Sequence, residues 1–281
     1  MSPGLDALQH LPPLREALAD HGLMAKKAFG QHFLLDLNIT RKIARLAGFA
    51  PGERVIEVGP GPGGLTRALL EAEARVTAIE KDERFRPLLE DLAAAAPPGA
   101  LTLVFGDALT TPAPAEPAHV VANLPYNVGT ALLINWLIGS WTPSAMTLMF
   151  QKEVAQRITA DVDSSAYGRL AVIAQATCHA ESVMDVPARA FTPPPKVDSA
   201  VVRLTPRADR PAPARLDALQ KLTAAAFGQR RKMLRASLKP LGGEGLIEAA
   251  GLNPQARAET IDVEGFLRLA DAWLAGRSRG P

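Results

Sequence analysis

Cysteine is almost absent from this chain of 281 residues, since Cys178 is the only one. A single thiol excludes an internal disulfide and a metal site built from several cysteines. Cys178 follows the sequence Ala-Gln-Ala-Thr at 174–177, so we predict a small buried residue, with a reactive nucleophile as the alternative. The five histidines have no ligand-like spacing, and we therefore expect no bound metal.

Long apolar runs and a strong excess of charge are also missing. No apolar stretch approaches the roughly 18 residues that a membrane-spanning helix needs. Residues 1–6 lack the charged start and apolar run of a secretory signal. We therefore expect a soluble, cytoplasmic protein. Its net charge is only +2, so binding to nucleic acid would require a local cluster of basic residues.

The first three quarters of the chain alternate between strand-like and helical patterns. The β-rich runs lie at 54–58, 74–79, 101–105, 119–122 and 146–150, and the helical patterns at 37–49, 65–72, 83–96, 131–138 and 152–160. This alternation is typical of a doubly wound α/β fold, in which helices cover both faces of a parallel sheet. Two later β-rich runs, 181–186 and 197–204, predict a closing antiparallel pair.

The composition changes at residues 206–213, where three prolines are mixed with charged residues. Such a segment is typical of a linker. Beyond it, the pattern is helical at 216–227, 231–238, 245–251 and 263–275. We therefore predict an α/β domain over residues 1–206 and a small all-α domain over residues 207–281.

A glycine-rich loop, 57–66, joins the first strand of the predicted sheet to its helix. Glycines let the backbone approach a ligand closely, and such loops suit nicotinamide dinucleotides as well as S-adenosylmethionine. Glu80 ends the second strand, where a carboxylate can accept both ribose hydroxyls; the alternative is an acid that caps the next helix. Asp107 follows the third strand and could accept from an adenine amino group, or cap a helix. Together with Glu57, these acids resemble those of the class I S-adenosylmethionine methyltransferases.

Residues 123–126, Asn123-Leu124-Pro125-Tyr126, follow the fourth strand. The segment offers a side-chain amide, a main-chain carbonyl and an aromatic ring in one loop. Amide and main-chain oxygens accept hydrogen bonds from an exocyclic amino group, and the ring can stack on a base drawn out of a helix. The segment is suited to holding an amino-bearing nucleobase; the alternative is a tight turn with a packed tyrosine.

Four segments occur in the order and spacing of the ribosomal RNA adenine dimethyltransferases. They are residues 30–34 (Gly-Gln-His-Phe-Leu), the glycine loop, residues 123–126, and residues 191–199 (Phe-Thr-Pro-Pro-Pro-Lys-Val-Asp-Ser). The resemblance covers essentially the whole chain and is strongest to the KsgA-type branch. It implies a Rossmann-like sheet, S-adenosylmethionine, and N6,N6-dimethylation of two adjacent adenosines near the 3′ end of 16S rRNA during ribosome biogenesis.

The resemblance also implies which residues form the site. It places the cofactor on His32, Leu34, Gly59, Gly61, Glu80, Asp107 and Asn123. From the chemistry of their side chains and backbone we further expect the target adenine to be held by Asn123, Leu124, Pro125, Tyr126 and Phe191. His32 stands where some relatives have asparagine, and it could instead be a loop residue without a ligand. Phe191 could instead pack under the proline run. The chemistry needs neither metal nor a covalent intermediate.

The densest basic cluster in the chain is Arg230, Arg231, Lys232, Arg235 and Lys239. Within a helix, Arg231, Arg235 and Lys239 would share one face, which could bind RNA phosphates. The alternative is a solvated charged surface. We expect a monomer.

Other functions remain open from the sequence. They are N6-adenine methylation of large-subunit rRNA, as in macrolide resistance, or of DNA; a small-subunit assembly factor in which catalysis is secondary; and a nicotinamide dehydrogenase.

Overall fold

The computed structural model describes residues 7–23, 32–125, 128–229 and 231–278. The chain forms two compact units. The first contains residues 1–133, 143–155 and 182–203, and the second contains residues 134–142, 156–181 and 204–281. The predicted boundary at residue 206 therefore does not coincide with the units. We predict that residues 1–206 bind the cofactor and carry out catalysis and that residues 207–281 contact RNA.

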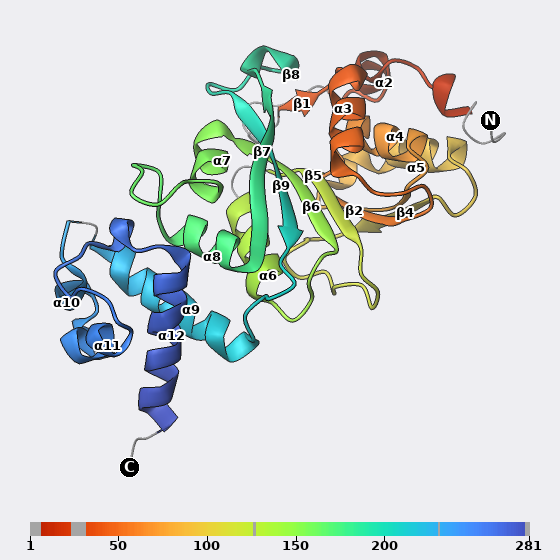
Figure 1. Ribbon diagram of the computed structural model, residues 1–281. Coiled ribbons are helices and arrows are strands. Elements are labelled where there is room, and N and C mark those ends of the chain that lie inside the picture. The colour runs from red at the N-terminus through yellow and green to blue at the C-terminus, as the bar shows by residue number, and fades with distance from the viewer. Residues whose placement is uncertain (1–6, 24–31, 126–127, 230, 279–281) are drawn as a thin grey trace. The chain divides into compact units, whose positions relative to one another are not determined.

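The central element is a seven-stranded sheet with the order β4-β3-β2-β5-β6-β9-β7 (Figure 1). Its strands are β2 (Arg54–Val58), β3 (Arg75–Glu80), β4 (Leu101–Phe105), β5 (His119–Asn123), β6 (Ala145–Gln151), β7 (Cys178–Val186) and β9 (Ser199–Pro206). The strands β2 to β6 pair in parallel. The predicted α/β fold with a mostly parallel sheet is thus confirmed, and the two late strands β7 and β9 are neighbours as expected.

The strand order reverses between β2 and β5. From β2 the chain continues outward through β3 and β4, and it then returns to the other side of β2 with β5 and β6. In open α/β sheets, the carboxyl ends of the strands at such a reversal form a crevice for ligands. The glycine loop after β2 and the Asn-Leu-Pro segment at the end of β5 both lie at this edge.

The central strands are buried because helices cover the sheet. Val55, Val120 and Val121 are almost fully buried, which explains the continuous apolar runs of β2 and β5. The helices that precede residue 160 include α2 (Leu14–Asp20), α3 (Leu37–Ala47), α4 (Gly64–Glu71), α5 (Arg86–Ala95), α6 (Gly129–Ile138) and α7 (Lys152–Ile158). The helix α3 is capped at its start by Asp36, whose carboxylate accepts from Asn38 N, and at its end by Gly48 in the left-handed region.

The second unit has a helical core of its own. Its helices are α8 (Arg169–Thr177), α9 (Pro213–Gly228), α10 (Leu234–Ser237), α11 (Gly243–Ala249) and α12 (Val263–Ser278). Residues of α8 such as Val172 pack in one cluster with Leu219 and Phe266. This packing explains why a helix that precedes residue 206 belongs to the second unit.

The predicted helix at 231–238 is wrong in extent. Only Leu234–Ser237 is α-helical, and Lys239 lies in a following 3-10 turn. The amides of Leu234 and Arg235 donate to the carbonyls of Ala256 and Pro254, and Met233 pairs with Arg257 as an isolated β-bridge. Because these bonds replace helical ones, the basic residues of this segment do not share one helical face.

Cys178 is buried at the start of β7. Burial raises the pKa of its thiol to about 11, which keeps it protonated and unreactive near neutral pH. The predicted structural role is confirmed. Among the residues that the structure describes, every helix is too short or too polar to span a lipid bilayer.

Candidate active site

The glycine loop bends sharply as it leaves β2. Gly59 and Gly61 have φ values of 70° and 52°, a region that residues with a side chain rarely adopt. A Cβ atom built on Gly59 would lie 3.5 Å from the ring of Pro125. The loop after β2 therefore comes into van der Waals range of the segment after β5.

Between these two loops lies a cavity of about 420 Å³. Eight residues predicted from the sequence line it: His32, Leu34, Gly59, Gly61, Glu80, Asn123, Leu124 and Pro125. The structure thus brings together residues from four distant parts of the chain. Their contacts with a cofactor and a base stay a prediction.

Glu80 holds one wall of the cavity in place. Its Oε2 accepts from the amide of Gly61 at 2.9 Å, and its Oε1 accepts from the amide of Asp82 at 2.8 Å. Burial raises the pKa of this carboxyl, and the two hydrogen bonds oppose that rise. Each carboxylate oxygen has a second acceptor site, so Glu80 can still accept hydroxyl groups of a ligand.

Glu57, in β2, is the most deeply buried acid of the cavity, with 1% of its surface exposed. Its Oε2 has no hydrogen-bond partner among the described residues. Burial raises the pKa of Glu57 to about 8. The Thr66 hydroxyl beside it opposes that rise, and the nearby negative charge of Glu80 adds to it.

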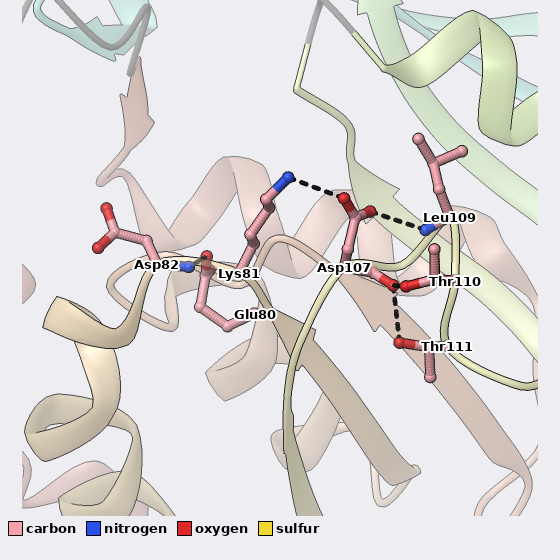
Figure 2. A network of polar contacts seen from close by, with 7 residues as sticks. All are labelled: Glu80, Lys81, Asp82, Asp107, Leu109, Thr110 and Thr111. Carbon is pink, nitrogen blue, oxygen red and sulfur yellow. Dashed lines mark hydrogen bonds and ion pairs between the residues drawn. The ribbon is translucent and has the colours of Figure 1, made fainter.

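Asp107 is held by its own neighbours, as Figure 2 shows. Its Oδ2 pairs with Lys81 Nζ at 2.7 Å, and its Oδ1 accepts from the amide of Leu109 at 2.9 Å. The Lys81 ammonium lowers the pKa of Asp107. Asp107 thus caps a turn, which is similar to the helix-capping role that the sequence allowed as the alternative to an adenine contact. It is not one of the described residues that line the cavity, so its contact with adenine stays a prediction.

A short strand pair joins two of the sequence motifs. The strand β1 (Phe33–Leu34) pairs antiparallel with β8 (Phe191–Thr192), so that Leu34 lies opposite Phe191. A ring N–H at His32 Nδ1 can donate to the carbonyl of Pro193, at 2.8 Å. Phe191 is 3% exposed, and the described residues that line the cavity do not include it. Its contact with a base therefore stays a prediction.

Sequence reasoning missed two aromatic residues of the cavity, Phe33 and Phe85. Their rings meet edge to face, with centroids 5.6 Å apart. Phe33 stands inside the motif at 30–34, where its position next to His32 was the available signal. Phe85 had no comparable signal, because it lies in a stretch with an ordinary helical pattern.

The remaining predicted residues lie elsewhere or outside the described ranges. Arg231, Lys232, Arg235 and Lys239 are all exposed, and none of them forms an ion pair with another described residue. Tyr126 and Arg230 lie outside the described residues.

The cavity fits S-adenosylmethionine better than a nicotinamide dinucleotide. It contains two buried carboxyl groups, and none of the described residues that line it is lysine or arginine. A pyrophosphate would bring negative charge next to these acids, whereas a sulfonium ion brings positive charge. No group of three potential metal ligands is found within the described ranges.

A change at Gly64 should disturb the cavity through its wall. A Cβ built on this first residue of α4 would lie 2.8 Å from the backbone oxygen of Leu34 and 3.0 Å from the side chain of Leu14. We expect Gly64→Ala to lower the unfolding temperature by about 3–6 °C, since overpacking costs about 1–3 kcal/mol. Thermal unfolding followed by circular dichroism measures this. The control is Gly245→Ala, where a Cβ meets nothing within 4 Å, and an equal effect of both variants would contradict the prediction.

Comparison with known proteins shows the family of the chain. The sequence model described as ribosomal RNA adenine dimethylase matches residues 22–274. A protein named ribosomal RNA small subunit methyltransferase A from Phenylobacterium zucineum is 74% identical over 275 residues, which cover 96% of each chain. A protein of the same name from Caulobacter vibrioides is 66% identical and covers 90% of this chain and 99% of its own.

Solved structures agree with the sequence comparison. A dimethyladenosine transferase from Plasmodium falciparum has a TM-score of 0.71 at 27% identity, covering 85% of this chain and 96% of its own. The 23S rRNA methyltransferase ErmE has a TM-score of 0.67 at 31% identity, covering 85% and 98%. The chain is a member of the ribosomal RNA adenine dimethylase family, and its cofactor is S-adenosylmethionine.

Proposed function

We propose that this protein dimethylates N6 of two adjacent adenosines near the 3′ end of 16S rRNA, in the cytoplasm, as the small ribosomal subunit matures. The observation that carries the proposal is that Asn123 and Leu124 line the same cavity as Glu80 and the glycine loop. One cavity can therefore hold both an amino-bearing base and the methyl donor.

Positioning is the main task of the residues after β5. The N6 atom of adenine is a poor nucleophile because its lone pair is delocalised into the ring. The Asn123 side-chain oxygen and the Leu124 carbonyl would accept the two N6 hydrogens, which favours a pyramidal nitrogen and directs its lone pair into the cavity. The cofactor supplies an electrophilic methyl group on sulfur. Aligning two reactants in this way can contribute on the order of 7 kcal/mol to the lowering of the barrier.

Aromatic residues would hold the base itself. Tyr126 would stack on one face of the flipped adenine, and Phe191 would bear on the other face or on the transferred methyl group. Stacking of this kind contributes about 1–3 kcal/mol per base. Because bases inside a duplex are out of reach, the target adenosines should lie in a loop or at an end.

The small subunit is the favoured substrate because the relatives with 74% and 66% identity carry a small-subunit name. ErmE, whose name gives 23S rRNA as its substrate, is much less similar, at 31% identity.

The first test is transfer of labelled methyl groups to small subunits that lack the modification, with large-subunit RNA and DNA as parallel substrates. We expect two methyl groups on each of two neighbouring adenosines of the small subunit. Label on large-subunit RNA alone would overturn the proposed substrate. Tight subunit binding without any transfer would instead make the protein an assembly factor.

The basic cluster at 231–239 is our candidate for binding rRNA phosphates. We expect Arg231→Ala/Lys232→Ala to weaken binding and to reduce the slope of log K against log salt by up to about 0.7–0.9 per lost contact. Filter binding of a small-subunit rRNA fragment over a series of salt concentrations measures both quantities. The matched control is Arg15→Ala/Arg45→Ala, two exposed arginines of the first unit. Equal slopes for both variants would contradict the role of the cluster.

A further inference from the structure

Glu57 is a buried acid that the proposed reaction leaves without a task. Its side chain lines the cavity, and its Oε2 lacks a hydrogen-bond partner among the described residues. Buried charges in proteins are normally paired, because an isolated ion loses its hydration on burial. An acid that lines a ligand cavity without a cationic partner therefore needs either a proton or a cationic ligand.

Among the described residues, no charged group supplies a cation to Glu57. Glu80 and His32 are the other titratable residues among the described ones that line the cavity, and Glu80 adds negative charge. On the neighbouring helix α4, Arg67 donates to the carbonyl of Pro12, and Glu71 pairs with Arg41. Burial without a neighbouring cation among the described residues therefore favours the neutral form of Glu57.

S-adenosylmethionine carries a net positive charge and could therefore serve as the cationic partner of an ionised Glu57. Its sulfonium and ammonium groups outweigh its carboxylate by one positive charge, whereas S-adenosylhomocysteine has no sulfonium charge and is neutral overall. A positive charge in a low-dielectric cavity favours the ionised form of a neighbouring acid. The two ligands should therefore differ in their effect on Glu57, although they differ by only one methyl group.

We propose that Glu57 is protonated in the free protein and releases its proton to solvent when S-adenosylmethionine enters the cavity, so that it distinguishes the charged methyl donor from its neutral product. The inference rests on the proposed function, because it assumes that the cavity binds the cofactor. Loss of the sulfonium charge on methyl transfer would leave Glu57 ionised and unpaired. Reprotonation of Glu57 would then accompany product release.

Calorimetry with the full chain tests the proposal without any measurement of turnover. S-adenosylmethionine and S-adenosylhomocysteine are titrated near pH 7 in buffers of different ionisation enthalpy. The dependence of the binding enthalpy on the buffer gives the number of protons released. We expect close to one proton with S-adenosylmethionine and less than half a proton with S-adenosylhomocysteine.

Glu57→Gln keeps the shape of the side chain and removes the ionisable group. We therefore expect the number of protons released on binding of S-adenosylmethionine to fall close to zero. The control is Glu90→Gln, an exposed acid of α5. Full release by Glu57→Gln, or equal release with both ligands, would overturn the inference. Binding of both ligands without proton release would also overturn it but leave the proposed function intact, whereas no binding of either ligand would refute the proposed function.

Stability gives a second, ligand-free measurement. An acid whose pKa is raised by folding stabilises the fold most below its unfolded pKa, and that contribution is lost as pH rises through the folded value of about 8. We therefore expect the unfolding temperature of Glu57→Gln to rise relative to the unchanged protein between about pH 5 and pH 8. A constant difference across this range would show that Glu57 is already ionised in the free protein.

Discussion

Asn123→Ala is expected to reduce methyl transfer by at least about 1,000-fold, because the variant loses the side-chain oxygen that would orient the attacking nitrogen. Asn123 ends β5 and lines the cavity, so no neighbouring residue of that strand can take its place. Binding of rRNA should change little, since the proposed phosphate contacts involve other residues. Single-turnover transfer to small subunits, together with filter binding, separates the two effects.

The matched control for this variant is Asn135→Ala, an exposed asparagine of α6. It removes the same amide group from a residue that does not line the cavity, and its transfer rate should stay near that of the unchanged protein. Normal turnover by Asn123→Ala would refute the positioning mechanism. Equal loss in both variants would point to a general effect on the fold.

Glu80→Gln should weaken binding of S-adenosylhomocysteine by about 30-fold or more, which corresponds to about 2 kcal/mol. The substitution leaves one acceptor oxygen where the carboxylate has two. It also turns an amide donor toward the backbone N–H of either Gly61 or Asp82, which both now donate to Glu80. The loss should thus come from weaker ribose contacts and from a less ordered glycine loop.

Calorimetry with S-adenosylhomocysteine measures the affinity of this variant. Glu83→Gln serves as its control, because Glu83 is an exposed acid only three residues further along the chain. Unchanged affinity of Glu80→Gln would mean that the ligand does not use this carboxylate.

The sequence predicted the sheet well because its signals are local. The runs 54–58 and 101–105 coincide with β2 and β4, and the glycine loop falls where the predicted strand–helix junction required it. Each of these features depends on a short pattern of buried apolar residues or on glycine backbone freedom. Such patterns persist in almost any tertiary context that supports a parallel sheet.

Features that depend on distant partners were less accessible. The segment 231–238 has a helical pattern, yet the carbonyls of Pro254 and Ala256 capture the amides of Arg235 and Leu234 and shorten the helix. No residue pattern within the segment predicts that these distant carbonyls accept its amides. The two-residue strands β1 and β8 are likewise too short to produce a pattern, and only their pairing makes them visible.

The candidate site was predicted less completely than the sheet but better than the features that depend on distant partners. The residue types of the glycine loop, Glu80 and Asn123 indicated a nucleotide-like cofactor and an amino-bearing base before any geometry was available. The sequence could not show that Asp107 is engaged by Lys81 and Leu109, because a carboxylate after a strand is compatible with either a turn cap or a ligand contact. It also gave no hint that Glu57 lacks a partner.

The pairing of β1 with β8 has a consequence for the protein while it is being synthesised. His32 and Pro193, which meet through a hydrogen bond beside this pair, are separated by 161 positions in the chain. During translation, residues 32–34 leave the ribosome long before β8, the strand that pairs with them, has been synthesised. Because chain segments fold in the order of their synthesis, the nascent protein remains without a finished cofactor wall until more than two thirds of it has emerged. A chain that ends before β8 would therefore lack the completed cavity, and we expect it to transfer no methyl groups.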